Sequence, residues 1–290
     1  MVIFKLIRVR QWVKNLFVFL PLIFGGKLLS ESGVWHGLAA FICFSFAASS
    51  IYVLNDIADR ESDRQHPLKR NRPIASGKVT VASAGIISVL LALVALAGSA
   101  VLLPESPGVL WIIAAYIGLN LLYSYWLKHF AIIDVMVIAV GFVLRVMAGG
   151  AACDIPVSPW LTVMVFMLTL FIAFAKRRDD LVKISSGKKI SRRSVAGYTL
   201  GFIDQTMSLL ASAMIVAYII YTLQPDVEAR FDSKYVYLTT IFVIAGILRY
   251  MQIAIVMKDS GQPTEKIYRD PFLLGCVICW ILSFIFIIYC

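Results

Sequence analysis

The sequence has 290 residues, of which 60% are hydrophobic and only 15% are charged, and its formal net charge is +10. A soluble domain of this length would carry about 25% charged residues, so the composition excludes an ordinary water-soluble protein. Long apolar stretches with few charges are typical of membrane-spanning helices. We therefore expect a polytopic membrane protein.

Nine helices are expected along the chain, because a membrane span must satisfy its own backbone hydrogen bonds. The apolar runs are too long for barrel strands and lack their alternation of polar and apolar residues. We expect one all-α membrane domain over residues 1–290. The expected helices cover residues 13–29, 36–59, 79–103, 108–127, 130–150, 158–176, 198–222, 235–257 and 271–290.

The positions of Lys and Arg predict the orientation in the membrane. Most of the 27 basic residues precede the first helix or lie in the connections after the second, fourth, sixth and eighth helices, all on one side. The opposite connections hold only Lys27, Arg230 and Lys234. This distribution predicts a location in the plasma or inner membrane. The N-terminus is expected on the cytoplasmic side, and Cys290 on the outer side. No nucleic-acid partner is expected, and the oligomeric state stays open between a monomer and a homo-oligomer.

Acidic residues at the end of the second helix are not required by this charge rule. The stretch 54–78 reads LNDIADRESDRQHPLKRNRPIASGK. At about 100° per helical residue, one amide and three carboxylates share an arc of about 100°, namely Asn55, Asp56, Asp59 and Asp63. Carboxylates on one face repel each other unless a cation lies among them, and oxygen ligands beside phosphates suit Mg²⁺. The pattern predicts a metal site, and its alternative is a solvated helix end neutralised by neighbouring arginines.

A second charged stretch, AFAKRRDDLVK (173–183), ends the sixth expected helix on the same side of the membrane. Lys176, Asp180 and Lys183 fall close together on the helix, with Asp179 to one side. A basic helix end is ordinary in a membrane protein, so this pattern alone leaves its role open. Beside the first cluster it predicts cations that hold phosphates and carboxylates that orient them or hold Mg²⁺.

Asn55-Asp56-x-x-Asp59-x-x-x-Asp63, on the second of nine helices, resembles the first aspartate-rich motif of the UbiA-type prenyltransferase superfamily. The resemblance implies an integral membrane enzyme with nine helices around a central cavity, where aspartate motifs bind Mg²⁺ and a diphosphate. Further stretches are similar to one branch, the decaprenyl-phosphate phosphoribosyltransferases. They are RQWVKN (10–15), DRQHPLKRNRPIASG (63–77), YSYWLK (123–128), GFVLRVMAGG (141–150), AKRRDDL (175–181), LRY (248–250) and GQPTE…RDP (261–271).

That branch transfers 5-phosphoribose from phosphoribosyl diphosphate to a polyprenyl phosphate. One departure from the general superfamily supports it: where a second motif of the DxxxD kind is usual, this chain has Lys176-Arg177-x-x-Asp180. The branch more often has Glu at the position of Asp180. Aspartate is shorter than glutamate by one methylene group, so whether this carboxylate extends as far into the site stays open.

The resemblance and the chemistry together give candidate roles. Breaking the C1–O bond of the donor builds negative charge on the leaving diphosphate, which Mg²⁺ would neutralise. The predicted metal ligands are Asp56, Asp59 and Asp63, and the predicted catalytic residues are Asp56, Asp59, Asn55 and Asp180. The side chains expected on the donor phosphates are Lys69, Arg70, Arg72, Lys176, Arg177 and Lys183.

The acceptor phosphate is expected at the inner membrane surface, near Lys14 and Asn15 or near Tyr123 and Lys128. For both lysines the alternative is contact with lipid headgroups. The acceptor phosphate is already ionised near neutral pH, so the reaction requires no strong general base. His66, beside Pro67, is as well explained as a loop residue as by a role in catalysis.

Three further features leave alternatives open. Arg145 lies deep in the fifth expected helix, so it either has a partner on another helix or braces the structure from an outward position. Asp204 begins the seventh helix, where it could touch the cavity. Cys276-x-x-Cys279 resembles a redox or metal pair but lies inside an expected span without a partner motif, which favours apolar packing.

The sequence leaves two alternatives to phosphoribosyl transfer. A prenyltransferase would move an isoprenoid from its diphosphate to an aromatic or lipid acceptor. A transporter would use the charged residues as a cation path, but transport sites lie near the midplane and often come with internal repeats. Here the carboxylates lie at helix ends, which favours an enzyme.

Overall fold

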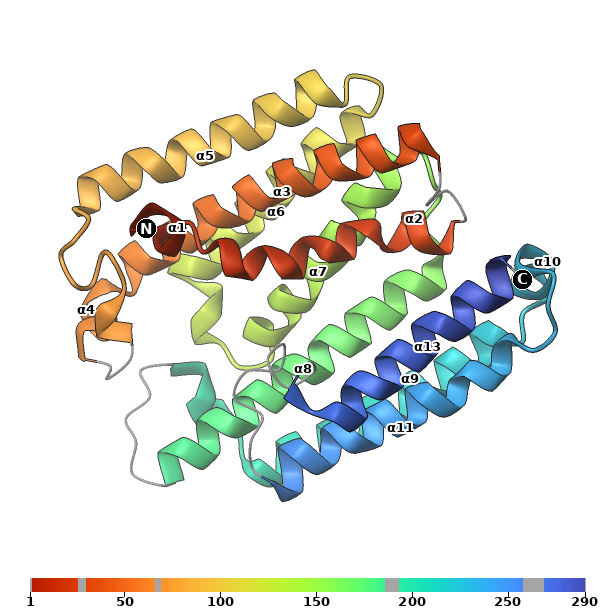
Figure 1. Ribbon diagram of the computed structural model, residues 1–290. Coiled ribbons are helices and arrows are strands. Elements are labelled where there is room, and N and C mark those ends of the chain that lie inside the picture. Colours follow the sequence, from red (N-terminus) through yellow and green to blue (C-terminus); the bar gives the residue numbers. More distant parts are fainter. Residues whose placement is uncertain (1, 26–29, 66–68, 186–192, 258–268, 290) are drawn as a thin grey trace. The chain divides into compact units, whose positions relative to one another are not determined.

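The computed structural model describes residues 2–25, 30–65, 69–185, 193–257 and 269–289. Within these ranges every regular element is a helix, which confirms the predicted all-α class (Figure 1). The chain divides into two compact units, Met1–Ser158 and Pro159–Cys290. His66 and the GQPTE part of the last motif lie outside the described residues.

The first unit begins with a short helix and a 3-10 helix and continues through four long helices. Its elements are α1 (Val2–Leu6), η1 (Val9–Phe19), α2 (Leu20–Phe24), α3 (Glu31–Ala58), α4 (Arg60–Gln65), η2 (Lys69–Asn71), α5 (Val81–Leu102), α6 (Pro107–Tyr125), η3 (Leu127–His129) and α7 (Ile133–Ala152).

Helix α3 is the centre of the first unit and contacts η1, α5, α6 and α7. Its buried side chains are mostly small, so neighbouring helices can approach closely, as is usual in membrane helix packing. Ser50 and Ser88 join α3 to α5 with their hydroxyl oxygens 3.1 Å apart, and Ser88 also donates to the Ser50 carbonyl at 2.9 Å. The two helices run side by side along most of their length (Figure 1).

The faces of α5 show how the sequence separates core from surroundings. Its buried residues are Ala84, Ser88, Ala95 and Ser99, which recur at helical spacing on one face. Large apolar side chains such as Val89 and Leu93 are exposed on the rest of the helix. An apolar outer surface is unfavourable in water and suits a lipid surrounding.

Gly149 allows the closest approach of η1 to α7. A Cβ atom at this position would lie 1.8 Å from the carbonyl oxygen of Val18. Only glycine therefore leaves room for the backbone of η1 here. The contact holds η1, with its polar residues, against α7.

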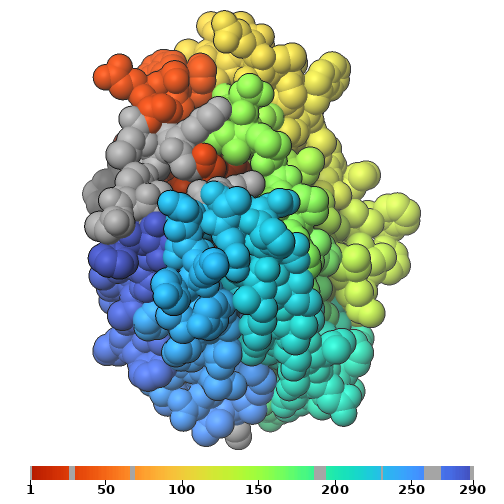
Figure 2. All heavy atoms as spheres, turned by 90° about the vertical axis from the view of Figure 1, so that its right-hand side faces the viewer, coloured from red at the N-terminus to blue at the C-terminus, as the bar shows by residue number. Residues whose placement is uncertain are grey.

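The second unit contains three long helices and several short ones. Its elements are α8 (Pro159–Ser185), η4 (Arg193–Gly197), α9 (Leu200–Thr222), α10 (Pro225–Phe231), η5 (Val236–Thr239), α11 (Thr240–Met251), the π-helical η6 (Gln252–Val256) and α13 (Pro271–Tyr289). Helix α8 packs against α9, and α11 packs against α13. The spheres of α13, in dark blue, lie against those of lighter-blue segments that precede it (Figure 2).

An ion pair between Arg249 and Asp270 joins two of the stretches found in the sequence, LRY and RDP. Arg249 donates from Nη2 to Asp270 Oδ2 at 2.6 Å and from Nε to Oδ1 at 3.2 Å. These charged hydrogen bonds hold the pKa of the Asp270 carboxyl below its usual value. Asp270 Oδ1 also accepts from the Leu273 backbone N–H at 2.8 Å, so the same residue starts α13.

Seven helices in the described ranges are long and apolar enough to cross a membrane, whereas nine were expected. The seven are α3, α5, α6, α7, α8, α9 and the stretch Val236–Val256. In the described part of the first expected span, 13–29, the chain forms η1 and α2, of which neither is long enough alone. The last corresponds to α13, which counts as a shorter apolar helix over Pro271–Ile287.

Candidate active site

The first acidic cluster lies where α3 ends and α4 begins. The two helices are separated by a turn at Asp59. Asp56 and Asp63 are buried, with 2% and 1% of their surface exposed, whereas the side chain of Asp59 is 38% exposed. The structure therefore differs from the single helical arc that the spacing predicts. The helix is interrupted at Asp59, and the Asp59 side chain is exposed, whereas those of Asp56 and Asp63 are buried.

A single arginine joins the two buried aspartates. Arg72 Nη1 lies 2.8 Å from Asp56 Oδ1 and 2.5 Å from Asp63 Oδ2. Lys69 Nζ lies 3.9 Å from the other oxygen of Asp63, and Arg70 is exposed on the same short helix, η2. Two residues predicted to bind donor phosphates thus lie directly against two predicted metal ligands.

Arg8 belongs to this cluster, although the sequence indicated only a role in orientation. Its Nη2 donates to Asp56 Oδ1, the oxygen that also accepts from Arg72. The guanidinium lies 5.3 Å from the centre of the Tyr52 ring. Arg8 has φ 52° and ψ 50°, a left-handed conformation that is uncommon for a residue other than glycine. No sequence signal marks this backbone turn, which explains why Arg8 was missed.

The third aspartate pairs with a lysine from another motif. Lys128 Nζ, on η3, donates to Asp59 Oδ1 at 2.6 Å. Tyr123 is buried near the end of α6, shortly before η3, and Asn55 is half-buried on α3. The structure therefore brings Lys128, predicted near the acceptor phosphate, to a predicted metal ligand.

Arg145 has partners on two other elements. The sequence left open whether this arginine has a partner on another helix or braces the structure from an outward position, and the structure shows the first. Its Nε donates to Asn15 Oδ1 at 2.8 Å, and its Nη2 donates to the Tyr116 hydroxyl at 3.1 Å. The guanidinium also lies about 5 Å from the ring centres of Phe44, Tyr116 and Phe142. Aromatic faces attract a cation, so the rings help to stabilise a buried charge.

Asn15 is held in place at both ends of its amide. Its Nδ2 donates to Ser45 Oγ at 2.9 Å, while its Oδ1 accepts from Arg145. The neighbouring Lys14 is half-buried on η1, and the positive charges of Arg145 and Arg8 both act on it. These positive charges raise the potential around Lys14, which favours the approach of an anion.

In the second unit, the end of α8 buries a different set of residues from the one predicted. Lys176 is exposed, whereas Arg177, Arg178 and Asp179 are buried. Arg177 Nη1 lies 3.3 Å from Asp180 Oδ2. Lys183 donates to Asp179 Oδ2, so this predicted lysine contacts the carboxylate that lies to one side of the predicted group.

Arg178 is a residue that the sequence analysis gave no role. Its Nε donates to Asp204 Oδ1 at 2.6 Å, and its Nη1 donates to the backbone carbonyl of Ala254 at 2.8 Å. It therefore connects α8 to α9 and to the π-helical turn η6. The sequence signal that could have found it is Asp204, expected at the start of the seventh helix, because a carboxylate at the end of an apolar helix requires a cation nearby.

Comparisons with known proteins cover nearly the whole chain. The family model described as "UbiA prenyltransferase family" matches residues 18–274. The chain belongs to this family.

Relatives and solved structures agree with the UbiA assignment. The decaprenyl-phosphate phosphoribosyltransferase of Mycolicibacterium smegmatis is 36% identical over 294 residues, covering 96% of this chain and 89% of that protein. The protein of the same name from Corynebacterium glutamicum is 32% identical, covering 98% and 86%. A UbiA homolog from Archaeoglobus fulgidus, solved with GPP and Mg²⁺, has a TM-score of 0.74 over 100% of both chains at 17% identity, which shows the fold.

The two buried aspartates, Asp56 and Asp63, fit a bound cation. Among the residues that the structure describes, no three His, Cys, Asp or Glu side chains form a metal-binding group. Arg72 Nη1 nevertheless contacts Asp56 and Asp63 together, so one positive group can bridge both carboxylates. Their oxygens are the ligand type that Mg²⁺ prefers. Asp59 pairs with Lys128 in this structure, and its role as a ligand stays a prediction.

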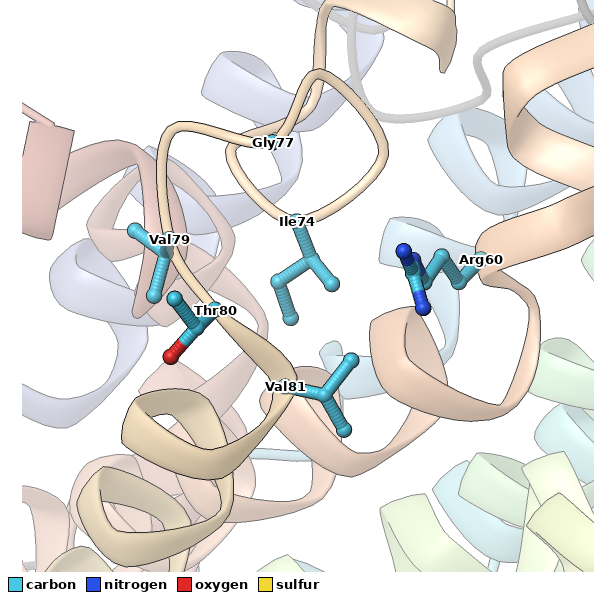
Figure 3. Close-up of a pocket in the computed structure, with 6 residues that line it drawn as sticks. All are labelled: Arg60, Ile74, Gly77, Val79, Thr80 and Val81. Atoms are coloured by element: carbon cyan, nitrogen blue, oxygen red, sulfur yellow. The ribbon is translucent and has the colours of Figure 1, made fainter.

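A pocket of about 340 Å³ lies near this cluster but is separate from it (Figure 3). Figure 3 shows the Arg60 guanidinium turned toward Ile74 and Val81 across the pocket. The described lining is Arg60, Ile74, Gly77, Val79, Thr80 and Val81. This lining includes none of the candidate site residues, so the pocket is not the candidate active site.

Proposed function

We propose that this chain transfers 5-phosphoribose from phosphoribosyl diphosphate to a polyprenyl phosphate and releases diphosphate. The observation that carries the proposal is the similarity, over nearly the full length of both chains, to curated decaprenyl-phosphate phosphoribosyltransferases. The buried aspartates and their cationic partners support it, because the reaction handles several phosphate groups. The length of the polyprenyl chain stays open.

The reaction forms one bond and breaks one. An oxygen of the lipid phosphate bonds to C1 of the ribose while the C1–O bond to the diphosphate breaks, and that electron pair leaves with the diphosphate. The lipid phosphate is ionised near neutral pH, so no side chain has to remove a proton from it. The residues around the reaction therefore have to position two anions and stabilise the leaving charge.

In the first unit we assign the leaving-group end of the reaction to the Asp56 cluster. Asp56 and Asp63 would hold Mg²⁺, with Asp59 as a third ligand and Asn55 orienting a ligand or a water. When bound, Mg²⁺ supplies positive charge that stabilises the leaving diphosphate. Arg72, with Lys69, Arg70 and Arg8 beside it, binds the donor phosphates, since a guanidinium can bind phosphate oxygens with two N–H groups.

We assign the acceptor phosphate to Lys14 and Lys128. Lys14 lies on η1 and Lys128 on η3, and the positive charges of Arg145 and Arg8 act on Lys14. Asn15 adjoins Lys14 on η1 and is held by Ser45 and Arg145. We therefore assign Asn15 the positioning of this part of the acceptor site, and we assign Tyr123, near the end of α6, to the same phosphate. Arg145 holds Asn15 through its Nε and so acts as a positioning residue.

The assignment of Lys176, Arg177, Lys183 and Asp180 to the donor rests on charge. Phosphoribosyl diphosphate carries a 5-phosphate that a prenyl diphosphate lacks, so its enzyme needs additional cations. Asp180 lies 3.3 Å from Arg177 and can orient that guanidinium. We place these residues on the donor phosphates.

We place the reaction at the cytoplasmic face of the plasma or inner membrane, with the whole chain acting as one membrane domain. In this arrangement η1 with α2, and α13, complete a set of nine spans with the seven long helices. The N-terminus is then cytoplasmic and the C-terminus outside. The donor is water-soluble and reaches the charged helix ends from the cytoplasm.

The proposal is tested with the purified full chain, Mg²⁺, a polyprenyl phosphate and phosphoribosyl diphosphate labelled in its ribose. We expect the label to move into the organic phase with time. A parallel reaction receives a labelled prenyl diphosphate and an aromatic acceptor. Transfer only in that second reaction would contradict phosphoribosyl transfer and show a prenyltransferase instead.

A further inference from the structure

Tyr250, on α11, carries a buried hydroxyl whose interactions the proposed mechanism does not explain. The residue is 6% exposed, and among the described residues its hydroxyl oxygen has no hydrogen-bond partner. The ring itself is well packed, with its centre 5.5 Å from that of Phe171. Buried polar atoms almost always have a partner, so an unpaired one suggests a ligand.

A buried carboxylate accompanies this hydroxyl. Asp179, on α8, is 6% exposed, and its negative charge acts on the Tyr250 hydroxyl. One of its oxygens, Oδ2, accepts from Lys183. The second unit thus places a hydroxyl, which can donate or accept, near an oxygen acceptor in a location with little access to bulk water.

The position of Tyr250 is fixed by the structure around it. The π-helical turn η6 follows directly, with the Met257 N–H donating to the Gln252 carbonyl five residues back at 3.1 Å. Arg178 donates to the Ala254 carbonyl inside this turn and to Asp204 on α9. Single π-helical turns occur frequently at functional sites. A braced backbone therefore holds the unpaired hydroxyl in place.

We propose that Tyr250 and Asp179 bind a ribose hydroxyl of the phosphoribosyl donor and thereby select a sugar donor over an isoprenoid one. The proposal rests on the proposed function and adds a specificity residue to it. The tyrosine hydroxyl donates to the sugar oxygen, and the carboxylate accepts the sugar O–H. An isoprenoid chain offers no hydroxyl, so the buried Tyr250 hydroxyl would stay unpaired, and such a site rejects ligands that lack the group.

The test compares Tyr250→Phe with the wild-type chain on phosphoribosyl diphosphate and on analogues that lack the 2- or the 3-hydroxyl. We expect the wild type to prefer the full ribose donor over one analogue. Tyr250→Phe should lower kcat/KM for the ribose donor about tenfold, the effect of one lost hydrogen bond in a buried site, and leave that for the analogue unchanged. The ratio of kcat/KM for the ribose donor to kcat/KM for the analogue then falls toward one.

The melting temperature provides a second readout that separates binding from folding. Tyr250→Phe removes a hydroxyl without a partner, so the variant should melt at or above the wild-type temperature. The matched control is Tyr218→Phe, because the Tyr218 hydroxyl lies 2.7 Å from Thr239 Oγ1 and accepts from Trp280 Nε1 at 2.8 Å. That control should melt at a lower temperature and keep the wild-type donor preference.

Two results would overturn the inference while leaving the proposed function intact. One is a Tyr250→Phe variant with the wild-type ratio of ribose donor to analogue, and the other is a variant that melts lower, as Tyr218→Phe does. A wild-type chain that transfers no phosphoribose at all would instead overturn the proposed function, and the inference with it.

Discussion

Asp56 and Asp63 show how buried carboxylates are kept in place in a largely apolar chain. Two negative charges removed from water repel each other and lose hydration, so they require cations nearby. Arg72 contacts both, and Arg8 adds a second partner for Asp56. The spacing of the aspartates could be read from the sequence, but the identity of their cations could not, because it depends on the left-handed backbone at Arg8 and on the 3-10 helix η2 that precedes Arg72.

Asp56 is the buried carboxylate of the first cluster that accepts hydrogen bonds from both Arg8 and Arg72. Asp56→Asn keeps the size of the side chain but removes the charge that holds the proposed metal ion and pairs with Arg8 and Arg72. We expect transfer to fall by about 100-fold or more, the range seen when a group that stabilises transition-state charge is lost. Initial rates under saturating Mg²⁺ measure the effect.

The matched control is Glu61→Gln, a carboxylate five residues away that is exposed and pairs with Arg64. It should keep the wild-type rate and melting temperature. An Asp56→Asn enzyme with near wild-type activity would remove the basis for placing the leaving group at this cluster.

Arg145 is the second residue for which the structure makes a quantitative prediction. Arg145→Met fills the aromatic cage with an apolar side chain but leaves Asn15 Oδ1 and the Tyr116 hydroxyl without their donor. Each unsatisfied buried group costs about 1–3 kcal/mol, so we expect a loss of about 2–4 kcal/mol in the free energy of unfolding. Thermal or denaturant unfolding of the detergent-solubilised protein measures it.

Arg145→Lys serves as the conservative comparison. A lysine retains the charge but cannot reach Asn15, Tyr116 and the Gly141 carbonyl with one planar group. It should recover only part of the stability. If Arg145→Met unfolds at the wild-type midpoint, the network contributes no stability, and the assigned positioning role fails.

At the scale of elements, hydropathy located the helices but not their internal geometry. The predicted second helix, 36–59, corresponds to α3, Glu31–Ala58, and the predicted fourth, 108–127, to α6, Pro107–Tyr125. The described part of the predicted first helix, 13–29, is instead a 3-10 helix followed by a short α-helix that ends at Phe24. Apolar content is the same for both helix types, so composition cannot distinguish them.

Gly149 tests how closely η1 must lie against α7. Gly149→Ala introduces a methyl group that would lie 1.8 Å from the Val18 carbonyl oxygen, a backbone atom that cannot move without shifting η1. Overpacking of this kind costs about 1–3 kcal/mol or more. We expect a clear drop in melting temperature and, because η1 carries Lys14 and Asn15, weaker binding of the acceptor lipid.

Gly118→Ala on α6 is the control, because a Cβ atom there has nothing within 4 Å. Alanine is the better helix former, so this variant should be at least as stable as the wild type. Equal melting temperatures for Gly149→Ala and Gly118→Ala would contradict the close contact.

At the scale of the whole molecule, motifs far apart in the sequence meet within each unit. Asn15 of RQWVKN contacts Arg145 of GFVLRVMAGG, and Asp59 contacts Lys128 of YSYWLK. In the second unit, Arg249 of LRY pairs with Asp270 of RDP. Sequence patterns identified these stretches one at a time. Their pairing depends on how the helices pack, which no local pattern contains.

The candidate site was therefore predictable in residue types and approximate location, but not in detail. Spacing and charge identified the aspartates and most of the cations. They did not identify Arg178, whose contacts cross three elements, or Tyr250, which becomes notable only when burial leaves its hydroxyl unpaired. Both are revealed by burial and hydrogen bonding.

The central claim is that the C1–O bond of phosphoribosyl diphosphate is broken and the ribose is moved to a lipid phosphate. The most direct test uses a donor with one label in the ribose and another in the β-phosphate, incubated with purified protein, Mg²⁺ and a polyprenyl phosphate. We predict that the ribose label enters the lipid phase while the β-phosphate label stays in water as diphosphate. A lipid phase without the ribose label, or one that carries the β-phosphate label, would contradict the claim.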